Sequence, residues 1–117
     1  MSYIFDIDDV TVWSPALRVG ELYVSMARDV ADVLDISTGM TAMASDYWEI
    51  EIAEFESFVR VMYRKYFSSE HPVFKTLIGA VLAPSIVLLE RGGKSVLSGS
   101  DEERKFIDRA HELSMPQ

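Results

Sequence analysis

The fold is decided by an apolar stretch at residues 73–89, which reads VFKTLIGAVLAPSIVLL. Only Lys75, Thr76 and Ser85 interrupt it with polar side chains. A segment that is apolar on all sides is typical of a helix buried at the centre of a domain. Its uncharged part, residues 76–89, has 14 residues, so we expect it to be too short and too interrupted to span a bilayer.

The continuation of this stretch allows two structures. Pro84 predicts a kink or a break in the helix. Residues 84–97 then either stay helical or form a hairpin that turns at Gly92-Gly93. Further on, Ser100 and Glu103 have the spacing of a capping box, which predicts a last helix ending at about Leu113.

The segment before the apolar stretch also has helical periods. Residues 15–34 predict an amphipathic helix, with Ser14 as its N-cap and Pro15 at its first position. One face of it is apolar and consists of Val19, Leu22, Tyr23, Met26, Val30, Val33 and Leu34. Gly20 lowers its helix propensity by about 1 kcal/mol, or else marks a place of close packing.

Strand signals lie on both sides of that helix. Residues 3–13 alternate around Asp8-Asp9 and predict a hairpin, and residues 48–52 predict a short strand. Residues 36–47 lack a period and predict a loop, and residues 53–67 predict a further helix. We therefore expect one α+β domain over residues 1–117, in which a small N-terminal β-hairpin packs with about four helices around the central apolar helix.

The composition bounds the class of protein. The chain has 117 residues and no Cys, which excludes disulfides, thiolate metal sites and a Cys nucleophile. Its first residues lack the basic and apolar regions of a signal peptide, so we expect a cytoplasmic protein. No glycine-rich phosphate loop, zinc spacing or Ser nucleophile elbow is present, and we expect no cofactor.

The negative charge lies almost entirely in the first half of the chain. Residues 1–56 hold 12 Asp or Glu and two Arg, a net charge of −10, whereas residues 57–117 carry +2. The total of −8 argues against binding nucleic acid or an anionic membrane through phosphate groups. Such asymmetry favours a cationic partner, and a basic protein is the partner we expect.

The densest acidic segment is the candidate for that contact. Its residues are Asp46, Tyr47, Trp48, Glu49, Glu51 and Glu54. Aromatic rings beside carboxylates hold cationic groups by cation–π and charge attraction together. The alternatives are a solvated strand edge with favourable charges at a helix start, or a site for a divalent cation, although the spacing of a calcium-binding EF-hand is absent.

Two further sets of residues suggest catalysis. The string from Phe5 to Thr11 resembles the first motif of the haloacid-dehalogenase superfamily; the resemblance implies a phosphatase-like enzyme with Asp6 as nucleophile and Asp8 as acid/base beside magnesium. That superfamily needs a doubly wound parallel sheet, and the alternative is an ordinary hairpin turn. An Asp108–His111 pair on the last helix is a candidate general base.

Three segments together resemble a family of small actinobacterial proteins of unknown function. They are residues 12–15 (VWSP), residues 55–59 (FESFV), and residues 69–73 (SEHPV) leading to residues 87–93 (VLLERGG). The resemblance implies a bacterial cytoplasmic setting and no catalytic residues.

Two classes of function follow. The first is a non-enzymatic acidic interaction module that binds a basic partner, in its most specific form an immunity or antitoxin-like protein. The alternative is a small-molecule- or metal-dependent enzyme that uses Asp6 and Asp8, or Asp108 and His111. A homodimer built on surplus apolar surface of residues 72–89 is compatible with either class.

Overall fold

In the computed structural model, which describes residues 2–117, two β-hairpins form one four-stranded sheet. The first hairpin consists of β1 (Ile4–Ile7) and β2 (Val10–Trp13), and the second of β3 (Met40–Ala44) and β4 (Tyr47–Ile50). Their inner strands, β1 and β4, pair in parallel, which gives the strand order β2-β1-β4-β3. The predicted α+β class and N-terminal hairpin are confirmed, and the sheet is larger than predicted.

The second hairpin corrects the prediction of a loop over residues 36–47. β3 is an edge strand that pairs with β4. Four of its five side chains are exposed, so its sequence lacks the alternation of apolar and polar residues that predicts a half-buried strand. The strand predicted at residues 48–52 is β4, and the chain turns helical at Ile52.

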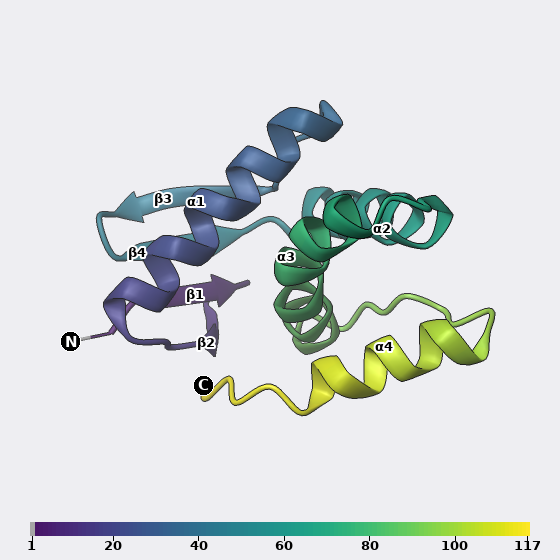
Figure 1. The fold of residues 1–117 in the computed structure, drawn as a ribbon. Coiled ribbons are helices and arrows are strands. Elements are labelled where there is room, and N and C mark those ends of the chain that lie inside the picture. Colours follow the sequence, from purple (N-terminus) through teal and green to yellow (C-terminus); the bar gives the residue numbers. More distant parts are fainter. Residues whose placement is uncertain (1) are drawn as a thin grey trace.

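Helix α1 (Leu17–Leu34) covers the inner face of the sheet (Figure 1). It begins later than predicted, because its N-cap is Ala16, and Ser14 instead donates its backbone N–H to the Pro116 carbonyl over 2.9 Å. Gly20 lies against the ring of Tyr3: a Cβ at this position would be 2.3 Å from Tyr3 Cγ. Close packing therefore explains the glycine in this helix.

Three more helices follow the sheet: α2 (Ile52–Ser68), α3 (Pro72–Arg91) and α4 (Asp101–His111). Each begins after a side chain that accepts a backbone N–H three residues further on, namely Glu51, His71 and Ser100. Such caps satisfy donors that the first helical turn leaves free. The predicted interaction of Ser100 with Glu103 is confirmed, and it starts α4 where expected.

Helix α3 continues through Pro84 and ends at Arg91, so the chain beyond Pro84 is helical and not a hairpin. A turn at Gly92-Gly93 and irregular chain follow it. Proline lacks the N–H that would bond to residue 80, and Figure 1 shows α3 bending near its middle. Ser85 adds to this bend, since its hydroxyl donates to the Val81 carbonyl over 2.7 Å.

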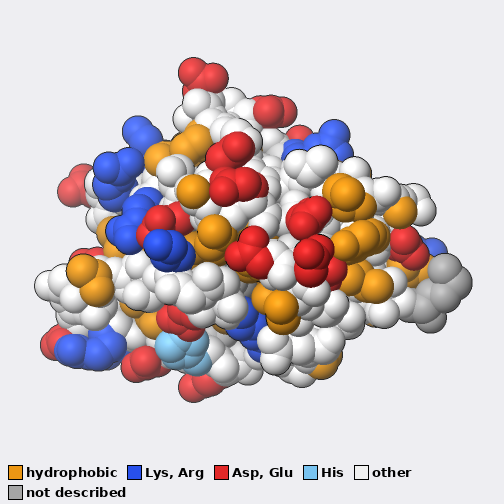
Figure 2. All heavy atoms as spheres, turned by 180° about the vertical axis from the view of Figure 1, so that it is seen from behind, with side chains coloured by type: hydrophobic (Ala, Val, Ile, Leu, Met, Phe, Trp, Pro, Cys, Tyr) orange, Lys and Arg blue, Asp and Glu red, His pale blue; other side chains and the backbone are white. Residues whose placement is uncertain are grey.

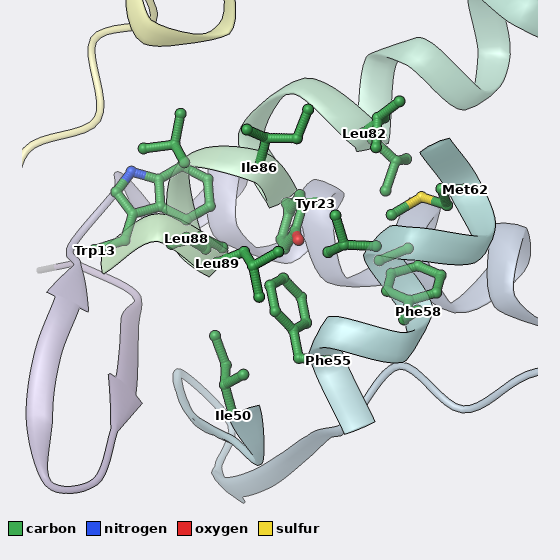
Figure 3. Packing of buried hydrophobic residues seen from close by; sticks show 14 of the residues in the cluster. Trp13, Tyr23, Ile50, Phe55, Phe58, Met62, Leu82, Ile86, Leu88 and Leu89 are labelled. Atoms are coloured by element: carbon green, nitrogen blue, oxygen red, sulfur yellow. The ribbon is translucent and has the colours of Figure 1, made fainter. Parts of the chain in front are cut away.

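The second half of α3 lies at the centre of the core (Figure 3). All side chains from Ser85 to Leu89 are buried. Rings from the sheet and α1 pack at one end, where the centroids of Phe5 and Trp13 are 5.2 Å apart. Side chains of α2 pack at the other end, and Phe58 and Met62 have no exposed surface. This part of α3 confirms the predicted central helix.

The first half of α3 is less enclosed than predicted. Val73 and Leu77 have 60% and 59% of their surface exposed. The helix has 20 residues, and by length and composition it is able to cross a membrane, so the expectation that this segment is too short to do so is wrong. Its buried second half, packed against α2 and β2, is the arrangement of a core helix.

Candidate functional site

A row of polar side chains crosses the outer face of the sheet. Through the strand pairings it runs in the order Thr11, Asp6, Glu49 and Thr41, one residue from each strand. Successive side chains of a strand point to opposite faces. Since Phe5 and Ile7 on either side of Asp6 point into the core, the row lies on the face away from α1.

Within this row, Asp6 is held in place by two hydrogen bonds. Its side chain is largely covered, with 8% of the residue exposed. The Thr11 hydroxyl donates to Asp6 Oδ1 over 2.8 Å, and the Tyr47 hydroxyl donates to Oδ2 over 3.0 Å. The hydrogen bond to Asp6 raises the pKa of Tyr47, and burial and the nearby negative charges act in the same direction. These two donors compensate Asp6 for the water that it loses.

The turn between β1 and β2 adds carboxylates at the end of the row. Asp8 and Asp9 have positive φ values of 50° and 64°, as a two-residue hairpin turn requires at its central positions. Asp8 lines one shallow hollow together with Glu49 and Glu51. Three carboxylates from two distant segments of the chain therefore meet at one place.

Figure 2 shows the molecule from the side opposite to Figure 1, with the sheet in front of α1. Acidic side chains gather over the middle of this face, and hydrophobic side chains lie beside them. Lys and Arg gather towards another edge. Carboxylates this close together add their fields, and the surface attracts cationic groups from a distance.

The residues predicted from the acidic segment separate onto the two faces of the sheet. Tyr47 and Glu49 point outward, in register with Ile4 and Asp6 of β1. Trp48 lies between them and packs against the core, and its Nε1–H donates to the Tyr3 hydroxyl over 2.6 Å. Its ring therefore does not share a surface with Glu49.

The other three predicted residues shape the ends of elements. Glu51 is the N-cap of α2 and accepts the backbone N–H of Glu54 over 2.6 Å. Glu54 also accepts a hydrogen bond from the Ser37 hydroxyl over 3.0 Å. Asp46 lies in the turn between β3 and β4, and its carbonyl accepts the N–H of Ile4 over 2.8 Å. Glu51 alone of these three lines the hollow with Asp8.

In the sequence, Asp6 and Asp8 form a candidate site that is separate from the acidic segment. The parallel pairing of β1 with β4 joins them into one surface, to which Thr11 and Thr41 also belong. The alternation in both strands places the acids on one face of each strand. Nothing local in either strand specifies that the two strands pair.

The string that resembles the haloacid-dehalogenase motif lies in a different kind of sheet. β1 has an antiparallel neighbour, β2, and a parallel one, β4, in contrast to the doubly wound parallel sheet of that superfamily. Both carboxylate oxygens of Asp6 accept hydrogen bonds from protein hydroxyls. Within residues 2–117, no three His, Asp or Glu side chains form a group that could hold a metal ion.

The imidazole of His111 has a partner on a different helix from the one expected. Its Nε2 lies 2.7 Å from Glu90 Oε1, at the end of α3, and Asp108 is an exposed residue of α4. The pair joins α4 to α3. His71 is also structural, because its Nδ1 accepts the N–H of Phe74 over 3.3 Å at the start of α3.

No curated protein and no solved structure matches this chain. The model of a family of unknown function (DUF6086) matches residues 1–117. The resemblance to a family of unknown function that the three sequence segments indicated is thereby confirmed. The α+β fold with its acidic sheet face is thus the fold of a member of that family, and the chain belongs to DUF6086.

Proposed function

We propose that the protein is a non-enzymatic interaction module of the bacterial cytoplasm, and that the acidic face of its sheet binds a basic protein. The observation that carries this proposal is the meeting of Asp8, Glu49 and Glu51 around one hollow beside Asp6. Part of the negative charge of residues 1–56 is thereby gathered on one surface, and Tyr47 supplies an aromatic ring at its edge; the acids of α1, such as Asp29 and Asp32, lie outside it.

The most specific form of this proposal is an immunity- or antitoxin-like role. A nuclease presents a basic surface to its substrate, and an acidic protein that covers this surface takes the place of the phosphate charges. Long-range attraction speeds such an association, and added salt weakens it. The hydrogen bonds that hold Asp6 fix part of the acidic row before binding, which lowers the entropy lost in the complex.

Paired variants test the proposal. Glu49→Lys with Asp8→Asn changes the charge of the acidic face by three units. Glu112→Lys with Asp108→Asn makes the same change on exposed residues in and directly after α4. Each protein is used to capture partners from the native organism's lysate at low and at moderate salt, and retained proteins are identified by mass spectrometry.

We expect one basic protein to be retained at low salt by the wild type and the α4 variant, and lost by the sheet-face variant. It should be released as salt rises. If the sheet-face and α4 variants retain the same proteins to the same extent, the acidic face is not the binding surface.

A further inference from the structure

Helix α1 carries two apolar stripes, and the protein buries only one of them. The buried stripe consists of Gly20, Tyr23, Val24, Ala27 and Ala31. The second stripe, which we call the outer stripe, consists of Val19, Leu22, Met26, Val30 and Val33. Val19, Leu22 and Val33 are 51%, 60% and 74% exposed, so the outer stripe lies at the surface.

The outer stripe forms one wall of an apolar groove; α3 forms the other wall, joined at one end by residues 113–115 of the C-terminal segment. Two hollows of about 320 and 260 Å³ lie along it, and Met26 lines both. Leu22 lies opposite Pro84 in the first hollow, and Val33 lies opposite Leu77 in the second. Asp29 is the one charged residue among those that line the two hollows.

This surface is as large as the main apolar patch of a typical monomer. The exposed parts of Val19, Leu22, Val33 and Leu77 add up to roughly 400 Å², within the range of the largest apolar patches on monomeric proteins. A stable protein–protein interface covers about 800 Å² of each partner. Met26, Val30 and Phe74 also line the groove and are partly exposed, so the area suits a small interface.

We propose that a second copy of the chain covers this surface, with the two α1 helices antiparallel about a two-fold axis at Met26. The intervals along the outer stripe are 3, 4, 4 and 3 residues, and they read the same in both directions. The axis therefore sets Val19 against Val33 of the second copy, and Met26 against itself. A two-fold interface requires this self-complementarity.

One pair of opposite charges beside the outer stripe favours the same arrangement. Arg18 lies at the start of α1 and Asp32 lies near its end, and both are exposed. Antiparallel helices bring Arg18 of each copy towards Asp32 of the other, whereas Glu21 and Asp29 on the same flank of α1 repel the acids of the other copy, so added salt should strengthen the contact. The acidic sheet face lies on the far side of the sheet from α1, so two chains of net charge −8 meet here without opposing their acidic faces.

The oligomeric state tests this inference, which does not rest on the proposed function. Sedimentation velocity of the full chain is measured from low micromolar to near-millimolar concentration. The variants Leu22→Lys and Val33→Lys place a charge on side chains that are exposed in the single chain, so they should fold normally. Leu97→Lys is the matched control, because Leu97 is 83% exposed and lines a different hollow, beside α2.

We expect the wild type and Leu97→Lys to form dimers, and the dissociation constant to rise at least 100-fold in Leu22→Lys and Val33→Lys. Arg18→Asp should weaken the dimer, and Arg18→Asp with Asp32→Arg should restore it. A wild type that stays monomeric throughout, or a dimer that both lysine variants leave unchanged, overturns the inference.

A cross-link tests the register. The chain has no Cys, so Met26→Cys introduces a single thiol at the expected axis. Copper–phenanthroline oxidation should convert this variant into a disulfide-linked dimer and leave a Leu97→Cys variant monomeric on a non-reducing gel. Equal cross-linking of the two variants contradicts the proposed axis.

Discussion

The hydroxyl of Tyr47 donates a hydrogen bond to Asp6 Oδ2 over 3.0 Å and ties β4 to β1 on the outer face of the sheet. Because Asp6 is largely covered, Tyr47→Phe leaves part of its carboxylate without a partner. We expect the free energy of unfolding to fall by about 1–2 kcal/mol, measured by urea denaturation.

A double-mutant cycle separates this bond from other effects of the ring. In an Asp6→Asn background, Tyr47→Phe should lower the free energy of unfolding by less than about half of its effect in the wild type, because the charged acceptor is gone. An equal cost in both backgrounds would show that the hydroxyl acts through some other contact.

The buried pair of Tyr23 and Ser85 should show coupling as well. Their hydroxyl oxygens lie 2.6 Å apart inside the core, and burial raises the pKa of Tyr23. Tyr23→Phe and Ser85→Ala should each lower stability by about 1–2 kcal/mol, and the double variant should lose less than their sum by about 0.5–1.5 kcal/mol. Strict additivity in thermal or urea unfolding would rule out the coupling.

Gly20→Ala should destabilise the protein although alanine favours helix. The gain in helix propensity is about 1 kcal/mol, but the new methyl group would meet the ring of Tyr3 at 2.3 Å and force α1 away from the sheet. We expect a net loss of about 1–3 kcal/mol. Ser25→Ala, at an exposed position of the same helix, is the control and should be neutral or slightly stabilising; a stabilised Gly20→Ala protein would contradict the packing seen here.

The contribution of Glu103 to the free energy of unfolding should be lost in acid. The Tyr63 hydroxyl donates to its carboxylate over 2.7 Å, and this bond, with others from Gly99 and Ser100, lowers the pKa of Glu103. A lowered pKa contributes stability that is present above the unfolded value of 4.5 and is lost as pH falls through the folded value. The difference in unfolding free energy between the wild type and Glu103→Gln should therefore shrink between about pH 6 and pH 3. A difference that stays constant over this range would exclude the linkage.

Much of the helical fold was predictable from local signals. Glu54 in the first turn of α2, Lys65 in its last turn and the Ser100 cap of α4 are local signals of where those helices begin and end. Local signals mispredicted the elements whose structure depends on tertiary contacts. Ser14 has the chemistry of an N-cap but bonds to Pro116, and β3 has no alternating pattern because it is an exposed edge strand.

The candidate site was predictable only in parts. The acids of residues 46–54 stood out by their density, and Tyr47 and Glu49 do share the outer face. The inward direction of Trp48 follows from alternation once β4 begins at Tyr47, one residue before the predicted strand. Asp6 and Asp8 belong to the same surface as Glu49 only because β1 pairs with β4, and no pattern within either strand indicates this pairing.

That parallel pairing also has a consequence for how the protein is made. Asp6 and Glu49 come together only after β4 has left the ribosome, and closing so long a loop costs entropy before any contact repays it. Until then β1 has no neighbouring strand on the side where β4 will pair, and Asp6 and Glu49 lie on separate parts of the chain. The complete acidic surface thus exists only once the sheet has closed. A partner that recognises it distinguishes the finished protein from the nascent chain.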